Sequence, residues 1–274
     1  MKKTLVVFVL LTVSSAFGQQ LSKEEKEILI LQDQRSLADG KLVAYLLHPD
    51  DNLRYRAAIA LANIQDTSTV ASLLPLLRDA TPSVRAAAAF ALGQVGSHRS
   101  EDSLLVALQS EADTVVFGRI AEALGRCGTE RALQAMVDRE IQPAVDSARD
   151  QYLLAIARFA QRGIRTERSI WFCFDQLTNA NAAVRWTALY ALWRSAPLRI
   201  VDVEIAKRFD GLKKLTLDPS PDVRINLATL LGKANITEAL DLLQSLSAVE
   251  RKHNEWRVQV AIVRALGALV SSHE

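Results

Sequence analysis

One short sequence pattern recurs along this chain and restricts what it can fold into. Its clearest copies are Val84-Arg85 running to Leu92-Gly93, and Val223-Arg224 running to Leu231-Gly232. Successive copies lie 31 to 39 residues apart. A period in this range is typical of stacked helical pairs, because each pair can bury its apolar face only against its neighbours. The slot that the clearest copies fill with arginine falls at Arg54, Arg85, Phe117, Arg149, Arg185, Arg224 and Gln259.

Each repeat is predicted to hold two helices, and no segment shows the period-two alternation of a strand. The first helix begins at turns such as Thr81-Pro82 and Ser220-Pro221, where the hydroxyl would cap the helix and proline would fill its first position. Gly93 is expected to end it. The predicted fold is an all-α solenoid of about seven two-helix repeats, with the last repeat incomplete.

The N-terminus has the pattern of a secretory signal peptide. Lys2 and Lys3 precede an apolar run over residues 5–13, and Ala16 and Gly18 form a small-residue cleavage site. The run is shorter than the roughly 20 residues that span a membrane. We therefore expect an exported protein, periplasmic or extracellular, with no membrane span after cleavage. The expected organisation is a signal peptide over residues 1–18, N-terminal capping helices over residues 19–47 and the solenoid over residues 48–274.

The charge balance argues against nucleic-acid binding. The chain has 33 basic and 31 acidic residues, and the signal peptide would remove Lys2 and Lys3 but no acid. A nucleic-acid-binding protein needs a concentrated basic face, and no dense run of lysine and arginine supplies one. We expect a protein or peptide partner instead.

The repeat spacing is longest between Arg149 and Arg224, and aromatic residues gather in that region. Tryptophan and tyrosine side chains that lie off the core stripe often anchor interfaces. The alternative is that they fill space opened by the longer loops. The candidate binding residues are Trp171, Phe172, Trp186, Tyr190 and Trp193.

The recurring arginine has two interpretations, a ligand clamp or a structural ladder. Its regular position favours the ladder, in which Arg85 or Arg224 meets a turn carboxylate such as Asp79 or Asp218. The predicted ladder residues are Arg54, Arg85, Arg185, Arg224, Asp79 and Asp218.

Signatures of catalysis are missing from the sequence. The four histidines are isolated from one another, and no phosphate loop, nucleophile elbow or pair of metal-binding cysteines is present. Cys127 and Cys173 lie in apolar surroundings and in different repeats, which favours buried free thiols over a redox or chromophore-attachment role. We expect no enzyme activity, metal or cofactor.

The units from Asp79 to Gly96 and from Asp218 to Arg224 resemble HEAT repeats of the phycobilisome-lyase type, over about residues 40 to 270. This resemblance implies an α-solenoid. Its functional implication is a protein-binding scaffold, with the partner along a concave face made by the second helices of repeats two to five. A bilin-lyase-like enzyme is a further alternative that the repeat type suggests.

The segment from Ile30 to Gly40, with the first two repeats, is similar to the N-terminal arm of exported bacterial cyclophilin-type peptidyl-prolyl isomerases. This resemblance implies that the chain is the recognition arm of such an isomerase. No catalytic residue carries over, because no β-rich segment is present to form a cyclophilin domain.

The last predicted helix, over residues 256–270, is apolar on more than one side. Val260, Val263, Leu266, Leu269 and Val270 all lie in it. The end repeat of a solenoid needs a polar outer face, so we expect this end to be covered by a downstream domain or by self-association.

Overall fold

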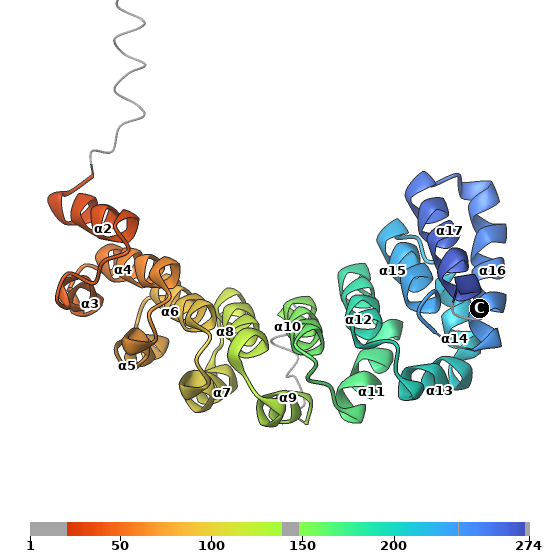
Figure 1. The fold of residues 1–274 in the computed structure, drawn as a ribbon, viewed down its shortest axis with the longest axis horizontal. Coiled ribbons are helices and arrows are strands. Elements are labelled where there is room, and N and C mark those ends of the chain that lie inside the picture. Colours follow the sequence, from red (N-terminus) through yellow and green to blue (C-terminus); the bar gives the residue numbers. More distant parts are fainter. Residues whose placement is uncertain (1–20, 139–147, 235, 272–274) are drawn as a thin grey trace, which may run out of the picture.

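The computed structural model describes residues 21–138, 148–234 and 236–271, which form helices and contain no strand. The predicted signal peptide lies outside these residues. The helices form two rows that follow an arc (Figure 1). The inner row consists of α2 (Lys23–Asp33), α4 (Asp51–Ile64), α6 (Pro82–Val95), α8 (Thr114–Cys127), α10 (Arg149–Gln161), α12 (Ala182–Ser195), α15 (Pro221–Leu231) and α17 (Trp256–Ser271). The outer row consists of α3 (Lys41–Ala44), α5 (Val70–Leu73), α7 (Glu101–Ser110), α9 (Glu130–Val137), α11 (Glu167–Asp175), α13 (Arg199–Lys207), α14 (Phe209–Leu215) and α16 (Thr237–His253). The all-α solenoid predicted from the repeats is confirmed.

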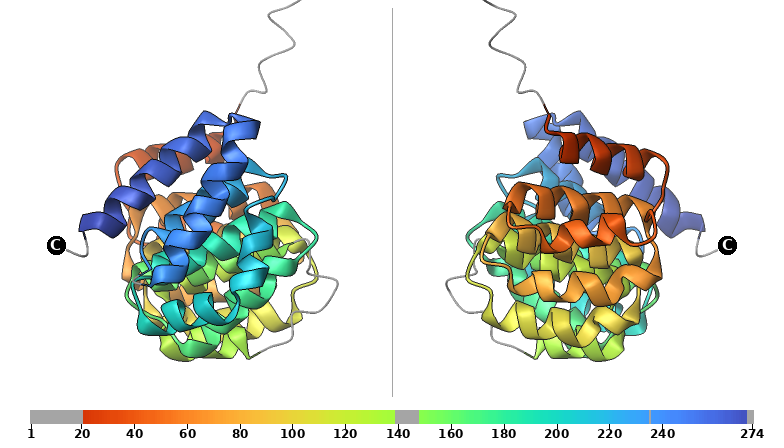
Figure 2. Two further views of the ribbon diagram at one scale, coloured as in Figure 1. Left: turned by 90° about the vertical axis from the view of Figure 1, so that its right-hand side faces the viewer. Right: turned by 90° about the vertical axis from the view of Figure 1, so that its left-hand side faces the viewer.

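The concave face belongs to the first helix of each repeat. In Figure 1 the arc opens on the side of α4, α6, α8, α10 and α12. Figure 2 views the molecule from its two ends, and both end helices, α2 and α17, rise above the middle of the stack on that same side. The prediction that second helices make the concave face is therefore wrong.

Small residues explain this direction of curvature. A Cβ atom added to Gly93 of α6 would lie 2.9 Å from the Cα of Ala123 in α8, and one added to Gly125 would lie 2.8 Å from the carbonyl oxygen of Ala155 in α10. Both glycines lie inside their helices, so Gly93 does not end α6 as predicted; the helix ends at Val95. Because the inner helices approach so closely, the stack curves toward the inner row.

The prediction of how α6 and α15 begin is correct for the prolines and wrong for the capping hydroxyls. Pro82 and Pro221 open α6 and α15 as expected. Thr81 and Ser220 occupy the N-cap positions, but neither side chain caps its helix. The Thr81 hydroxyl donates instead to Oδ2 of Asp51, at 3.0 Å, which joins the starts of two neighbouring inner helices.

The arginine ladder exists, but Arg54, Arg85, Arg185 and Arg224 each reach forward to a carboxylate of the following repeat. Arg149, in the same slot, donates to the amide oxygen of Gln176 at 3.0 Å. Arg54 Nε lies 2.8 Å from Asp79, and Arg185 Nε lies 2.7 Å from Asp218. The predicted pairing of Arg85 with the Asp79 carboxylate, and of Arg224 with that of Asp218, is wrong. Two glutamates take those places, with Arg85 bound to Glu111 at 2.8 Å and Arg224 bound to Glu250 at 2.6 Å.

Each ladder arginine also binds the turn before its own helix. Arg85 Nη1 donates to the backbone carbonyl oxygens of Asp79 and Ala80, at 2.9 and 3.2 Å. The hydrogen bond from Arg54 holds the pKa of the Asp79 carboxyl below its usual value, against the opposing effect of burial. The ladder therefore ties consecutive repeats together along one edge of the stack. The slot held by Phe117 interrupts it, because a phenyl ring can form no such bond.

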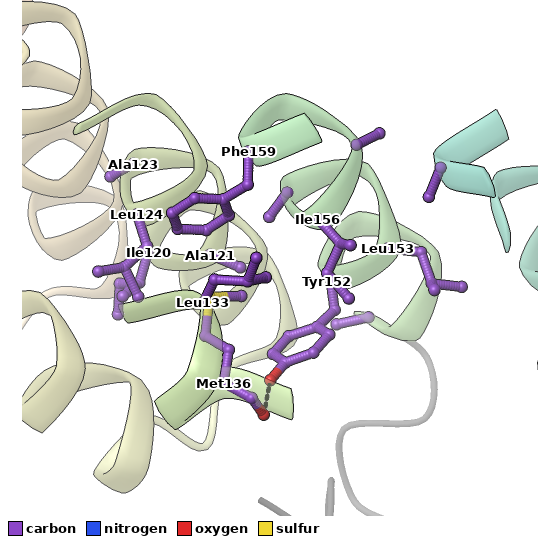
Figure 3. Packing of buried hydrophobic residues seen from close by; sticks show 14 of the residues in the cluster. Ile120, Ala121, Ala123, Leu124, Leu133, Met136, Tyr152, Leu153, Ile156 and Phe159 are labelled. Atoms are coloured by element: carbon purple, nitrogen blue, oxygen red, sulfur yellow. Dashed lines mark hydrogen bonds between the residues drawn. The ribbon is translucent and has the colours of Figure 1, made fainter. Parts of the chain in front are cut away.

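The core runs continuously between the two rows, and Figure 3 shows it where α8, α9 and α10 meet. Tyr152 of α10 is buried, and its ring lies 6.0 Å from that of Phe117 and 5.9 Å from that of Phe172, measured between centroids. Its hydroxyl donates to the backbone carbonyl of Met136 in α9. One side chain thus joins an inner helix to two outer ones.

The last inner helix, α17, carries exposed apolar side chains, as the sequence indicated. Trp256 is 67% exposed and Val263 is 69% exposed, whereas Leu269, which we expected to share this surface, is buried. Covering of this end by a second copy or a downstream domain stays a prediction. No helix in the described part of the chain is both long and apolar enough to cross a membrane.

Candidate binding surface on the inner helices

Three of the five candidate binding residues meet on α12 and form an aromatic trio, Trp186, Tyr190 and Trp193. Their spacing of four and three residues places them on one side of the helix. The centroid of the Tyr190 ring lies 6.3 Å from that of Trp186 and 5.1 Å from that of Trp193, with both contacts edge to face. All three are half-buried, so each retains surface for a ligand.

Hydrogen bonds from both neighbouring inner helices hold the aromatic trio. Gln161 of α10 donates from Nε2 to the Tyr190 hydroxyl at 3.1 Å. Trp193 donates from Nε1 to Oδ1 of Asn226 in α15 at 2.9 Å. The rings of Tyr190 and Trp193 are therefore held in place before any ligand arrives, which reduces the entropy that binding would cost. Trp186 contacts the Tyr190 ring edge to face.

Trp193 stands in the slot that Gly93 and Gly125 fill elsewhere, and two cations lie over its ring. The Arg194 Cζ is 4.2 Å from the ring centroid, and the Lys233 Nζ is 4.7 Å from it. Arg194 also lies 5.1 Å from the Tyr190 ring. These are cation–π distances, so the rings orient both charges. Desolvation lowers the pKa of Lys233, and the nearby charges of Arg194 and Arg165 lower it further.

Arg194 and Lys233 belong to a repeated position that the sequence analysis missed. The slot nine residues after the ladder position holds a cation in four successive repeats. Counting residues from each ladder position would have found it. We call this set the inner cation row; it consists of Arg126, Arg158, Arg194 and Lys233.

In the first half of the inner cation row, one carboxylate of the protein lies among the arginines and offsets part of their charge. The Glu122 carboxylate lies 3.2 Å from Arg126 and 3.0 Å from Arg158, and Arg119 adds a third contact at 2.9 Å. Burial opposes ionisation of Glu122, but these three guanidinium groups outweigh it and hold its pKa below the usual value. The second half differs: within the described residues, Arg194 and Lys233 contact aromatic rings and neither pairs with an acid.

A hollow of about 540 Å³ continues the surface from α15 to α17. Lys233 lies at its border, together with Ile225, Thr229, Trp256 and Val260. The hollow therefore combines apolar walls with a charged edge, next to the aromatic trio.

The other two candidate residues lie elsewhere, on α11 of the outer row. Phe172 packs against the core beside Tyr152, which accounts for it structurally. Trp171 is 37% exposed. The structure therefore divides the predicted five-residue patch between two rows of helices, so Trp171 is compared with Trp186 in the experiment described below.

The two cysteines are buried and free, as predicted. Burial raises the pKa of both thiols. Among the described residues, no group of three or more histidine, cysteine, aspartate or glutamate side chains is arranged to hold a metal ion.

The comparisons with known proteins agree with this architecture. A family model for HEAT repeats matches residues 40–124 and 72–157. The matched part of the chain, residues 40–157, therefore consists of HEAT repeats. Among curated proteins, none matches it.

Solved structures with the same fold include natural and engineered proteins. An engineered protein superposes with a TM-score of 0.58 and 20% identity, over 92% of this chain and 79% of its own. The archaeal HEAT-like repeats protein from Thermococcus onnurineus NA1 gives a TM-score of 0.52 and 16% identity, over 84% of this chain and 99% of its own. The complex of CpcE and CpcF of phycocyanin lyase from Nostoc sp. PCC7120 gives a TM-score of 0.51 and 18% identity, over 93% of this chain and 96% of its own. At these identities the likenesses show the fold alone.

Proposed function

We propose that this chain is an exported scaffold, without catalytic activity of its own, that binds a segment of a partner protein along its concave face. The observation that carries the proposal is the aromatic trio on α12, half-buried and held by hydrogen bonds from α10 and α15. Rigid, partly exposed tryptophan and tyrosine side chains are the residues that most often dominate binding energy at interfaces.

The surroundings of the trio suit a polypeptide. A segment that crosses the inner helices would pass over the trio and continue into the hollow between α15 and α17, where Ile225 and Val260 offer apolar contacts and Thr229 a hydroxyl. An apolar centre bordered by polar groups is the usual composition of a protein interface.

Export is the second part of the proposal, and it rests on the N-terminal sequence. Lys2 and Lys3, the apolar run over residues 5–13 and the Ala16–Gly18 site together form the pattern of a cleaved signal peptide. The partner would then be met outside the cytoplasm.

Photo-cross-linking in the native host tests both parts. A photoreactive p-benzoylphenylalanine replaces either Trp186 on the inner row or, as the matched control, Trp171 on the outer row. We expect a protein adduct at position 186 and none at position 171, and we expect the cross-linked chain to begin at Gln19. An adduct at 171 alone would move the binding site to the outer row. Absence of adducts at both positions would contradict the scaffold function, and an adduct that begins at Met1 would contradict export.

A further inference from the structure

A carboxylate of the protein itself already occupies the first half of the inner cation row, and it indicates which chemical group the second half could bind. In its first half, the carboxylate of Glu122 receives contacts from Arg119, Arg126 and Arg158. Charge-assisted hydrogen bonds of this kind are stronger than neutral ones. The same repeated position, two repeats further along, presents Arg194 and Lys233 with no carboxylate from the described residues.

The second half of the inner cation row, Arg194 and Lys233, is energetically unfavourable without a bound anion. Arg194 and Lys233 both lie within cation–π distance of one indole ring, and the charge of Arg194 acts on Lys233. The Nε atom of Arg194 is buried and, among the described residues, has no hydrogen-bond partner. Desolvation, together with the charges of Arg194 and Arg165, lowers the pKa of Lys233. An anion placed beside Trp193 would offset the repulsion between the two cations.

We propose that Arg194 and Lys233 form a carboxylate-binding site for an acidic, extended segment of a partner protein, whose neighbouring apolar side chains contact the aromatic trio and the hollow beside α17. This inference rests on the proposed scaffold function and specifies the chemistry of its partner. Both cations contact the same ring, so one short segment can reach both.

A single-stranded nucleic acid is the competing ligand, because stacked aromatic rings with basic residues also suit bases and phosphates. The surface favours the peptide. A nucleic acid needs a continuous basic groove along its backbone, whereas the carboxylate of Glu122 lies among the arginines of the first half of the inner cation row and would face the phosphates. The hollow beside α17 is lined by apolar side chains such as Ile225 and Val260, which suit a peptide, and by the cations Lys233, Arg257 and Arg264, which suit an acidic one.

The test uses a random dodecapeptide library displayed on phage and selected on the purified protein. The variant Arg194→Gln/Lys233→Gln removes both charges of the site. Its matched control, Lys214→Gln/Lys252→Gln, removes two exposed charges from the outer helices α14 and α16. We expect the pools selected on the unaltered protein and on the control to be enriched in aspartate and glutamate over the input, and this enrichment to disappear with the site variant.

An enriched acidic peptide, synthesised with a fluorescent label, should bind the site variant at least about tenfold more weakly than the control, since hydrogen bonds to charged groups are lost. The single variant Lys233→Gln, at an exposed position, repeats the test if the double variant melts abnormally. Selection of peptides without acidic enrichment would overturn this inference and leave the scaffold function standing. If no peptide is selected, the result would contradict both the carboxylate-binding site and the scaffold function. Displacement of the peptide by a twelve-nucleotide oligodeoxythymidylate that binds more tightly would assign the site to nucleic acid.

Discussion

Replacing Arg224 with alanine is expected to lower the free energy of unfolding by about 3–5 kcal/mol, because it leaves a buried charge without its partner. Glu250 is 1% exposed, and Arg224 Nε binds its Oε1 at 2.6 Å. Arg224 Nη1 also donates to the backbone carbonyl oxygens of Asp218 and Pro219, at 2.5 and 3.3 Å. The substitution therefore removes contacts to two repeats at once.

Chemical denaturation followed by circular dichroism measures this loss. Arg85→Ala provides the comparison, since its pair with Glu111 is more exposed and should cost less, about 1–3 kcal/mol. The double variant Arg224→Ala/Glu250→Leu should recover much of the loss, because no charge is then buried alone. An Arg224→Ala protein that unfolds at the same denaturant concentration as the unaltered one would contradict the ladder as a structural device.

Truncating Tyr152 is also expected to lower the free energy of unfolding strongly. Tyr152→Ala should cost about 3–5 kcal/mol, the range for removing a buried aromatic ring and leaving a cavity. Tyr152 joins α10 to the outer helices through its contacts with Phe172 of α11 and the carbonyl of Met136 in α9, as Figure 3 shows for the latter.

Tyr152→Phe separates the ring from its hydroxyl. This variant keeps the packing and loses only the hydrogen bond to Met136, so a smaller loss of about 1–3 kcal/mol is expected from the carbonyl left without its donor. Thermal melts of the two variants measure the difference. Equal losses in both would show that the hydroxyl, and not the ring, determines the contribution of Tyr152.

The repeat pattern predicted the fold because each copy specifies the same local structure, a turn followed by an inner helix with a stripe of alanine. It did not predict which row is concave, since curvature arises from small differences in helix spacing that accumulate along the stack. Gly93 and Gly125 are the residues from which the direction of curvature could have been predicted. Their close contacts with the next inner helix identify the side on which the repeats crowd together.

The candidate site was also predicted only in part, because the sequence shows which residues share a helix but not which helices lie side by side. Trp186, Tyr190 and Trp193 share one side of a single helix, so sequence spacing alone grouped them. The partnership of Trp193 with Lys233 depends on how two repeats 39 residues apart are stacked, because the ladder slots of these repeats are Arg185 and Arg224. Trp171 is near the trio in sequence but lies on the outer row, which only the packing of α11 determines.

Fluorine NMR can show whether the partner binds the inner face around α12. The protein contains four tryptophans, and 5-fluorotryptophan labelling gives each a separate signal, assigned by single substitutions. Two of them, Trp186 and Trp193, belong to the aromatic trio, while Trp171 lies on the outer row. On titration with the partner recovered by cross-linking, we expect the signals of Trp186 and Trp193 to shift and that of Trp171 to stay unchanged. A shift of the Trp171 signal with no change at Trp186 and Trp193 would show that the partner binds the outer row and not the inner face.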